Sequence, residues 1–458
     1  MALTAGTDSN STWSSGTTFL LAAIGAAVGL GNIWKFPYVV GVSGGGAFVL
    51  VYVLCVALIA IPILIGELLI GRLGSKSPPV AMASVAERSG RARSWGIVGF
   101  MGMIVGYLIA TFYSVIAGWT LAYIFKAAGG FGGASPAEVA SQFDELLASP
   151  ATLTAWHTVF LFATLFIVAR GLQGGIEKAV KFLMPSLFVM LLVMIGYGMV
   201  AGDLGAALTF LFSTDFSKID GPVILSAIGQ SFFSIGVAMG LMMVYGSYVP
   251  KNVSLTRASL IIAVADTLVA ILAGLMIFPL VFANGLDPAS GPGLIFKTLP
   301  TAFAAMPGGA LFGALFFILL AFAAITSSIS IIEPIVAYGR DRWGMSRVKG
   351  CTVFGILAWL IGMTSVFSFN VWSDVTPLGA FKIFEGKTIF DLIDYFTANL
   401  LMPLGGILIA LFVGWRIKPE YLESELSFPT PLMGKIWLLL IRFVAPAAIL
   451  WVMVSSLT

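Results

Sequence analysis

The sequence predicts an all-α polytopic membrane protein. Its mean hydropathy is +1.03, and only 10% of its 458 residues are charged, whereas a soluble domain carries about 25%. Uncharged runs recur along the chain, for example over residues 46–66 and 298–332. A helix of about 20 apolar residues crosses the hydrocarbon core of a bilayer. A transmembrane β-barrel would show short alternating segments instead.

Eleven spans account for these runs. We expect them at residues 17–41, 46–72, 95–126, 153–171, 176–201, 220–247, 255–284, 308–339, 350–373, 389–416 and 433–456. If the N-terminus is cytoplasmic, the inner loops hold seventeen Lys and Arg residues and the outer loops hold five. Positive loops stay on the cytoplasmic side. The distribution therefore predicts a cytoplasmic N-terminus and a C-terminus outside.

The segments between the spans leave little room for other functions. Residues 1–16 are polar and lack Lys and Arg, so they predict a cytoplasmic segment and not a secretory signal. The longest outer loops, 127–152, 202–219 and 374–388, are too short for a soluble catalytic domain. We therefore expect the lipid bilayer as a partner, no enzymatic activity and no nucleic-acid partner.

Two spans carry clusters of glycine. The first contains "LAAIGAAVGLGNIWKFP" (21–37), and the sixth contains "GQSFFSIGVAMGLMMVYGSY" (229–248). Glycine inside a helix costs about 1 kcal/mol relative to alanine. One explanation is close packing through small-xxx-small contacts, which the spacing of Gly25 and Gly29 fits. The other is a pair of broken helices, because unwound backbone is tolerated at membrane depth where it lines a cavity.

The positions of the two clusters favour broken helices. They lie in the first and sixth spans, at corresponding places in two five-span halves. This is the pattern of a 5+5 inverted-repeat transporter. The halves would be residues 17–201 and 220–416, with an extra C-terminal span at 433–456.

The motifs resemble one family. "GAAVGLGNIWKFP" with "GGGAF" is similar to the first helix of the neurotransmitter:sodium symporter family, "GQSFFSIG" with "YGSYVP" to its sixth, and "AAITSSISIIEP" to its eighth. The resemblance implies a sodium:amino-acid symporter of a bacterial plasma membrane, which imports hydrophobic and aromatic L-amino acids by alternating access. A sodium-dependent amino-acid sensor with the same site is the alternative.

The resemblance also implies two Na⁺ ions, and sodium prefers oxygen ligands. The first site would use the Ala27 carbonyl, Asn32, Ser234 and Asp266. The second would use the carbonyls of Gly25, Val28 and Ala323 and the hydroxyls of Thr326 and Ser327. Residues 323, 326 and 327 share one helix face. Alternatively, the two hydroxyls bond back to carbonyls of their own helix.

Asp266 carries a further expectation. Chloride-dependent members of the family use chloride to offset sodium, whereas chloride-independent members have a carboxylate nearby. Here Ala270 stands where some relatives have an acid, and Asp266 is itself a charge within a span, which is expensive and indicates function. We expect transport without chloride.

The resemblance places the substrate between the first, third, sixth and eighth spans. Its carboxylate would meet the amides of Leu30 and Gly31, the Tyr113 hydroxyl and the first sodium. The remaining expected contacts are Ala27, Ile109, Phe233, Ser234, Gly236, Met239, Ala324, Ser327 and Ile331. None of these side chains is charged, so a charged substrate side chain would lack a partner. Amine-selective relatives have Asp at the position of Gly29.

Lys35 and Asp394 would form the outer gate, with Phe233 and Tyr113 as a lid beneath it. The family commonly has Arg at position 35, and Lys lacks its bidentate fork. Alternatively, Lys35 snorkels to the outer interface. An acid at Asp341 usually pairs with an Arg before Trp13, but this chain has Asn10 there. We therefore expect closure by hydrogen bonds and Trp13 packing, and a shift toward inward-open forms.

Two more positions bear on movement. Gly175 and Pro185 both weaken the start of the fifth span. Some bacterial relatives unwind here to let water reach the second sodium, although an ordinary helix start explains the pattern equally well. Glu67, in the second span, is placed to accept hydrogen bonds from amides freed by the breaks.

Overall fold

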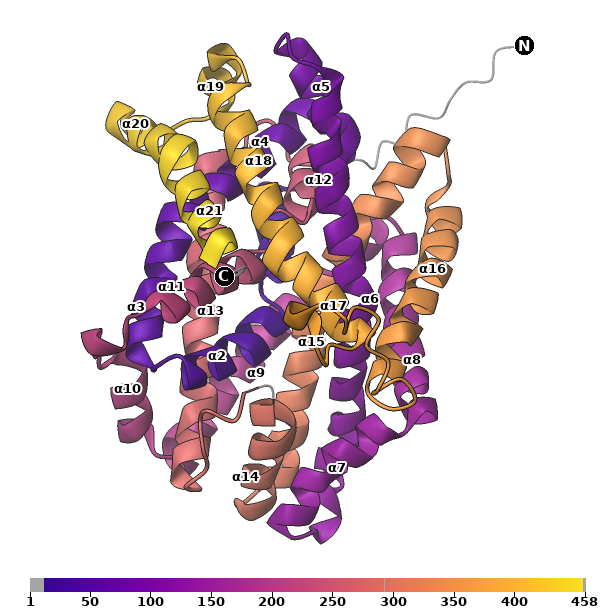
Figure 1. The fold of residues 1–458 in the computed structure, drawn as a ribbon, viewed down its shortest axis with the longest axis vertical. Coiled ribbons are helices and arrows are strands. Elements are labelled where there is room, and N and C mark those ends of the chain that lie inside the picture. Colours follow the sequence, from indigo (N-terminus) through magenta and orange to yellow (C-terminus); the bar gives the residue numbers. More distant parts are fainter. Residues whose placement is uncertain (1–11, 292, 456–458) are drawn as a thin grey trace.

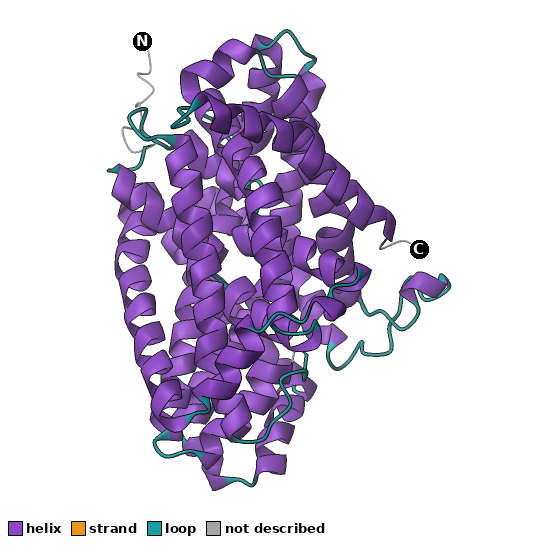
Figure 2. Ribbon diagram, turned by 90° about the vertical axis from the view of Figure 1, so that its left-hand side faces the viewer, coloured by secondary structure: helices purple, strands orange, loops and turns teal. Residues whose placement is uncertain are grey.

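The computed structural model describes residues 12–291 and 293–455, and this part of the chain is helical without a strand (Figures 1 and 2). The α-helices are α1 (Gly16–Ala27), α2 (Phe36–Val42), α3 (Gly46–Cys55), α4 (Ile61–Gly74), α5 (Pro78–Arg88), α6 (Gly96–Ala128), α7 (Pro136–Ala148), α8 (Pro150–Ala169), α9 (Glu177–Ala201), α10 (Leu204–Phe212), α11 (Gly221–Ile235), α12 (Leu241–Ser247), α13 (Leu255–Ala283), α14 (Leu299–Ala305), α15 (Gly309–Trp343), α16 (Arg347–Ser368), α17 (Ile389–Tyr395), α18 (Met402–Trp415), α19 (Pro419–Glu425), α20 (Pro431–Leu439) and α21 (Ala445–Ser455).

Short π-helical segments precede an α-helix or join two α-helices at six places among the described residues. These are η1 (Gly31–Lys35), η2 (Val56–Ala60), η5 (Leu172–Ile176), η7 (Leu294–Thr298), η9 (Phe396–Leu401) and η10 (Leu440–Val444). Isolated π-turns of this kind are frequent at functional sites. Two of them, η1 and η5, lie where the sequence predicted irregular helices.

The helices agree with the predicted spans. Within the described ranges, nine helices are long and apolar enough to cross a membrane, or ten if the pair Gly16–Ala27 and Gly31–Val42 counts as one span bent by 46°. Helices α11 and α12 fall within the remaining predicted span, 220–247, and each is too short to cross alone. The fold is therefore the predicted inverted-repeat architecture with broken first and sixth helices.

The break in the first span follows from its residues. Helix α1 stops at Ala27, and Val28 is extended with φ −71° and ψ 101°. The chain turns helical again at η1, where the Asn32 amide donates to the Gly29 carbonyl at 3.1 Å. The last carbonyls of a helix lack partners within it. The break therefore frees carbonyls on α1 and amides around residue 30.

The break in the sixth span is built differently. Three of its residues have left-handed backbones, namely Gly236 (φ +73°), Ala238 (φ +64°) and Gly240 (φ +75°). This region suits glycine and is strained for alanine. The Ala238 amide donates to Glu67 Oε1 at 3.0 Å, and Glu67 is fully buried. The role predicted for Glu67 as acceptor for a break is confirmed.

The long helices run between two ends of the molecule. Helices α5 and α19 lie at one end, called here the inner end, and α7, α10 and α14 lie at the opposite, outer end (Figure 1). Helix α15 packs along α6, while α12 packs against α4 and α11 against α3. The two breaks meet between these groups.

Candidate functional site

A small cavity of about 20 Å³ lies where the two breaks face α6 and α15. Its lining comes from five α-helices, from η1 and from the two breaks: Ala26, Ala27, Gly29, Leu30, Gly31, Ile109, Tyr113, Phe233, Gly236, Met239, Leu241, Ser327 and Ile331. Ten of the residues expected at the substrate are among them. Ser234 and Ala324 are buried nearby but do not line it. Ala26, Gly29 and Leu241 were not predicted as lining.

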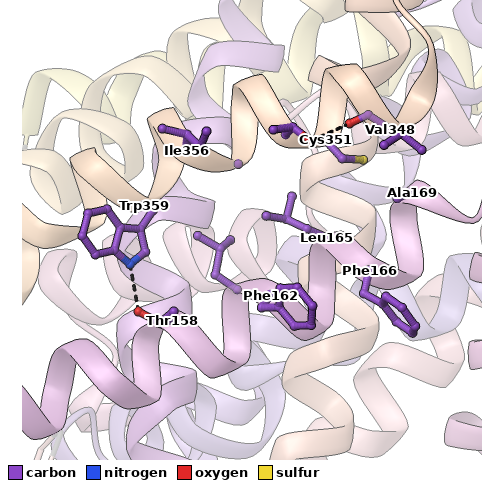
Figure 3. Close-up of a pocket in the computed structure, with 12 residues that line it drawn as sticks. Thr158, Phe162, Leu165, Phe166, Ala169, Val348, Cys351, Ile356 and Trp359 are labelled. Atoms are coloured by element: carbon purple, nitrogen blue, oxygen red, sulfur yellow. Dashed lines mark hydrogen bonds between the residues drawn. The ribbon is translucent and has the colours of Figure 1, made fainter.

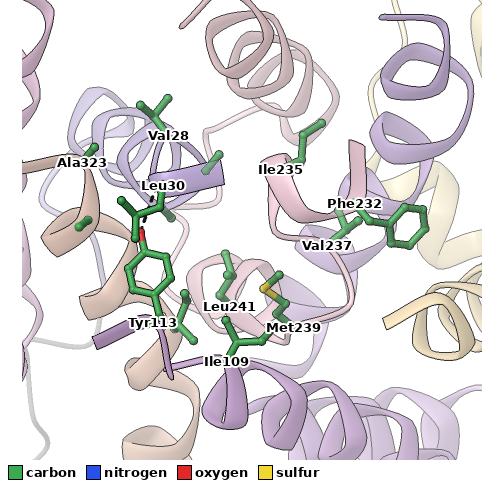
Figure 4. Packing of buried hydrophobic residues seen from close by; sticks show 14 of the residues in the cluster. Val28, Leu30, Ile109, Tyr113, Phe232, Ile235, Val237, Met239, Leu241 and Ala323 are labelled. Carbon is green, nitrogen blue, oxygen red and sulfur yellow. Dashed lines mark hydrogen bonds between the residues drawn. The ribbon is translucent and has the colours of Figure 1, made fainter. Parts of the chain in front are cut away.

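Tyr113 reaches from α6 to the first break. Its ring points at Leu30 (Figure 4), whose amide donates to the Tyr113 hydroxyl at 3.2 Å. The side chain is only 4% exposed. The amide freed by the break is thus bonded to the tyrosine hydroxyl, and a carboxylate that took the place of this bond would meet two donors.

Two glycines of this break lie close to groups that line the cavity. A Cβ on Gly29 would lie 2.3 Å from Ser327 Oγ and 2.9 Å from the Tyr113 hydroxyl. A Cβ on Gly31 would lie 3.1 Å from the Phe233 ring. An aspartate at position 29 would therefore collide with the groups that face the cavity. At Gly25 the packing explanation also applies, because a Cβ there would meet Met184 Sδ at 2.8 Å.

Three predicted ligands of the first sodium come together from η1, α11 and α13. Asn32 Nδ2 donates to Ser234 Oγ at 3.0 Å and to Asp266 Oδ1 at 2.7 Å. Ser234 Oγ donates to Asp266 Oδ2 at 2.7 Å. Tyr52 also donates to Ser234 Oγ, at 3.1 Å. All four side chains are buried. The Ser234 and Asp266 oxygens form a desolvated set with one carboxylate, which suits a small hard cation, while Asn32 faces them with Nδ2 and its Oδ1 accepts from the Gly29 amide at 3.1 Å.

The predicted second site brings α1 and α15 together. Ser327 Oγ donates to the carbonyls of Val28 at 3.3 Å and Gly25 at 3.4 Å. Thr326 behaves differently, because its hydroxyl bonds back to the Ala323 carbonyl at 3.0 Å. The alternative of local back-bonding is thus realised by Thr326 and not by Ser327. A cation here would take the place of these weak hydroxyl contacts.

A larger cavity of about 590 Å³ lies on the outer side of the site. Lys35 and Asp394 both line it, but they are not among the ion pairs of the described residues. The Lys35 ammonium lies instead 4.2 Å from the centre of the Phe233 ring. Phe233 lines both cavities, so its ring separates them.

The inner side of the site is closed. Trp13 is 2% exposed, its indole Nε1 donates to the Tyr245 carbonyl at 3.2 Å, and its amide donates to the Tyr248 carbonyl at 3.0 Å. Its ring packs edge-on against Tyr245 at 5.0 Å. The expectation of closure by hydrogen bonds and Trp13 packing agrees with this geometry.

Asp341 does not contact the N-terminal segment within the described residues. Its carboxylate accepts from the Ser77 amide at 2.6 Å and pairs with Arg340 at 3.4 Å. Asn10, at the position of the usual arginine, lies outside the described residues. Asp341 is therefore engaged with its own helix and with the residue before α5.

Sequence reasoning missed a buried ion pair at the inner end. Glu333 of α15 is fully buried and accepts from Arg347 Nη1 at 2.9 Å, from Arg347 Nη2, and from the Tyr248 hydroxyl at 2.8 Å. Arg347 also donates to the Val168 carbonyl at the end of α8. The signal was an acid inside the apolar run that follows Ser330, and such acids mark functional positions.

The start of α9 is intact in this structure. Helix α9 continues through Pro185, and η5 precedes it. A Cβ on Gly175 would lie 2.0 Å from the Ile167 carbonyl, so close packing on α8 accounts for this glycine. The closed start does not exclude opening, because a π-turn and a proline flank the first turns.

An apolar groove of about 400 Å³ lies apart from the breaks, between α8 and α16 (Figure 3). Its side chains include Phe162, Leu165, Ile356 and Trp359, and Trp359 Nε1 donates to Thr158 Oγ1 at 2.9 Å. It has no charged lining residue. The polar groups able to orient an amino acid lie at the breaks instead.

Comparisons with known proteins agree with this geometry. The model of the sodium:neurotransmitter symporter family matches residues 10–130 and 139–458. The chain is 37% identical over 448 residues to YhdH of Bacillus subtilis (strain 168), described as an uncharacterized sodium-dependent transporter, with 97% of each chain covered. A relative from Haemophilus influenzae, also described as a sodium-dependent transporter, is 34% identical over 97% of this chain and 98% of its own.

A solved structure is also similar. MhsT, crystallised in complex with L-phenylalanine, matches with a TM-score of 0.88 at 42% identity, over 97% of this chain and 99% of that chain. With the two broken helices and the oxygen clusters in place, the conclusion is direct. This chain belongs to the sodium:neurotransmitter symporter family and is a sodium-dependent membrane symporter.

Proposed function

We propose that the chain imports hydrophobic and aromatic L-amino acids together with sodium, by alternating access, across a bacterial plasma membrane. The observation that carries the proposal is the convergence of the Leu30 amide and the Tyr113 hydroxyl on an uncharged cavity beside the Asn32–Ser234–Asp266 cluster. The polar end suits an α-carboxylate and the apolar end suits an uncharged side chain.

The apolar lining supports a range of side chains. Met239 and Leu241 are flexible, and Phe233 and Ile331 add an aromatic and an aliphatic wall. The cavity of about 20 Å³ must expand to admit a substrate, and displacement of the Phe233 ring into the outer cavity provides that space. MhsT binding L-phenylalanine supports the aromatic part of the range.

Two sodium ions are proposed as co-substrates, one at each oxygen cluster. The first would lie between Asn32, Ser234 and Asp266, next to the substrate carboxylate. The second would lie between the carbonyls of α1 and the hydroxyls of Thr326 and Ser327. An ion there ties α1 to α15, so it would stabilise the closed inner end.

We propose that transport is independent of chloride, and the same cluster supports this. Asp266 already supplies a buried negative charge against the first sodium, and Ala270, one turn further on, is also buried. A chloride beside this carboxylate would be repelled. Uptake should therefore persist when chloride is replaced by gluconate, and a clear loss of uptake would contradict this part of the proposal.

Uptake into proteoliposomes tests the proposed sodium-coupled transport of amino acids. A sodium gradient should drive accumulation of Leu, Ile, Val, Met, Phe, Tyr or Trp, whereas Lys and Glu should not compete. Equal uptake with potassium in place of sodium would overturn the symporter. Sodium-dependent binding without counterflow would point to a sensor.

Gly29→Asp should abolish amino-acid binding because of its contacts with Ser327 and Tyr113, and Gly196→Ala, which meets open space in α9, is the matched control.

A further inference from the structure

The N-terminal segment binds two elements through alternate residues. Trp13 faces α12, as described above. Its neighbours face the start of α9, where the Thr12 carbonyl accepts from Gln173 Nε2 at 3.0 Å and the Ser14 amide and hydroxyl each donate to Glu177 at 2.7 Å. Residues 12–14 therefore bridge α12 and the η5–α9 junction.

Glu177 depends on this bridge for its hydrogen bonds. It is 2% exposed, and Ser14 supplies a donor to each of its carboxylate oxygens. Among the described residues it also pairs with Lys181, which lies at 3.4 Å and is half exposed. A buried carboxylate needs donors, and short bonds to an ionised acceptor are the strong ones. If residues 12–14 move away, the Glu177 carboxylate loses both Ser14 donors, and water must replace them.

The residues immediately before Glu177 form a weak part of the helix. Residues 172–176 form the π-turn η5, preceded by Gly171 with φ +85°. Two residues here hydrogen-bond to the N-terminal segment: Gln173, which lies within η5, and Glu177, which follows it as the first residue of α9. Hydration of Glu177 would therefore bring water to the first turn of α9.

We propose that Glu177 is the latch of the inner end: it holds residues 12–14 closed in place of the missing ion pair with Asp341, and its release opens the start of α9 at the same time. This inference rests on the proposed transport function. Glu177 is a positioning residue, because it acts on the substrate pathway through Ser14 and the Trp13 that adjoins it.

The chain offers a matched control. At the outer end Ser135 and Glu138 form the same kind of pair, with the Ser135 amide and hydroxyl donating to Glu138 Oε2 at 2.8 and 2.7 Å. This pair caps α7, is exposed, and makes no hydrogen bond to residues 12–14. Its loss should leave the inner end unchanged.

The test uses thiol labelling of the full-length protein. Ser330→Cys is the reporter, because Ser330 is buried and its hydroxyl lies 2.7 Å from that of Tyr245, beneath Trp13. Cys55 and Cys351 are replaced by alanine. Without sodium, Glu177→Ala should speed maleimide labelling about tenfold or more and Ser14→Ala about threefold, since the latter removes one of the two bonds. Glu138→Ala should match the parent.

Several outcomes would overturn the latch. These are parental labelling rates in both Glu177→Ala and Ser14→Ala, or an equal increase in Glu138→Ala. A lower melting temperature in Glu177→Ala, with an unchanged ratio of labelling rates with and without sodium, would assign it a purely structural role. If sodium fails to slow labelling of the parent, the proposed sodium coupling fails, while the comparison of variants still decides the latch.

Discussion

The outer and inner ends of the central site use charge in opposite ways. At the outer end Lys35 and Asp394 line a cavity of about 590 Å³ without pairing, and the Lys35 ammonium lies on the Phe233 ring. The ion pair in the same lining, Lys297 with Asp144, is exposed. At the inner end Arg347 and Glu333 form a buried pair that also holds Tyr248. Exposed pairs contribute little, whereas breaking a buried pair is costly. The outer end is therefore easy to move, and the inner end is held until several contacts are lost together.

The largest expected effect comes from breaking the buried pair. Arg347→Met leaves Glu333 buried without a counter-charge, which should cost about 3–5 kcal/mol, with the Tyr248 hydroxyl still donating to that carboxylate. Because the uncompensated carboxylate must hydrate, we expect a lower melting temperature in detergent and fast labelling of the Ser330→Cys reporter. The double variant Arg347→Met/Glu333→Gln should recover most of both. Parental stability and labelling in Arg347→Met would remove the contrast between the two ends.

A smaller effect is expected from the tryptophan at the inner end. Trp13→Phe keeps an aromatic ring against Tyr245 but loses the Nε1 bond to its carbonyl, a change of about 1 kcal/mol. Labelling of the same reporter should rise about fivefold. Trp451→Phe, at a position 46% exposed in α21, is the control. If both variants behave alike, the bond does not help to close the inner end.

The smallest effect is expected at the outer gate. A double-mutant cycle of Lys35→Met and Asp394→Asn, read out as sodium binding without amino acid, should give a coupling energy below about 0.5 kcal/mol. The coupling should increase when a substrate is bound, if the two side chains then meet. Strong coupling already present without substrate would mean that the outer end is held by charge after all.

The sequence was sufficient for the fold because membrane helices leave strong local signals. Long apolar runs fixed the spans, and the two glycine clusters fixed the breaks. The proximity of Asn32, Ser234 and Asp266, which we propose as the first sodium site, could also be predicted, since Asn32 and Ser234 lie in recognisable motifs and Asp266 is a charge within a span. Glu67 was predicted for the same reason, as an acid facing freed amides.

What the sequence concealed were pairings between distant segments. Glu177 stands beside Lys178 and Lys181, which makes it look like a surface residue, and only the fold shows Ser14 against it. Arg347 was counted among the basic loop residues, although it reaches Glu333. Leu241 became a lining residue because the left-handed turn at residues 236–240 redirects the start of α12 toward the cavity.

The Phe233 ring has a consequence for how the substrate is sensed. The Phe233 side chain lines the small cavity at the breaks and also the larger outer cavity, and the Lys35 ammonium lies on its ring. A substrate that moves the ring must also move the lysine. Substrate binding in the small cavity is thereby converted into a displacement of the Lys35 charge in the outer cavity. This displacement is an electrical signal that precedes the passage of any ion across the membrane.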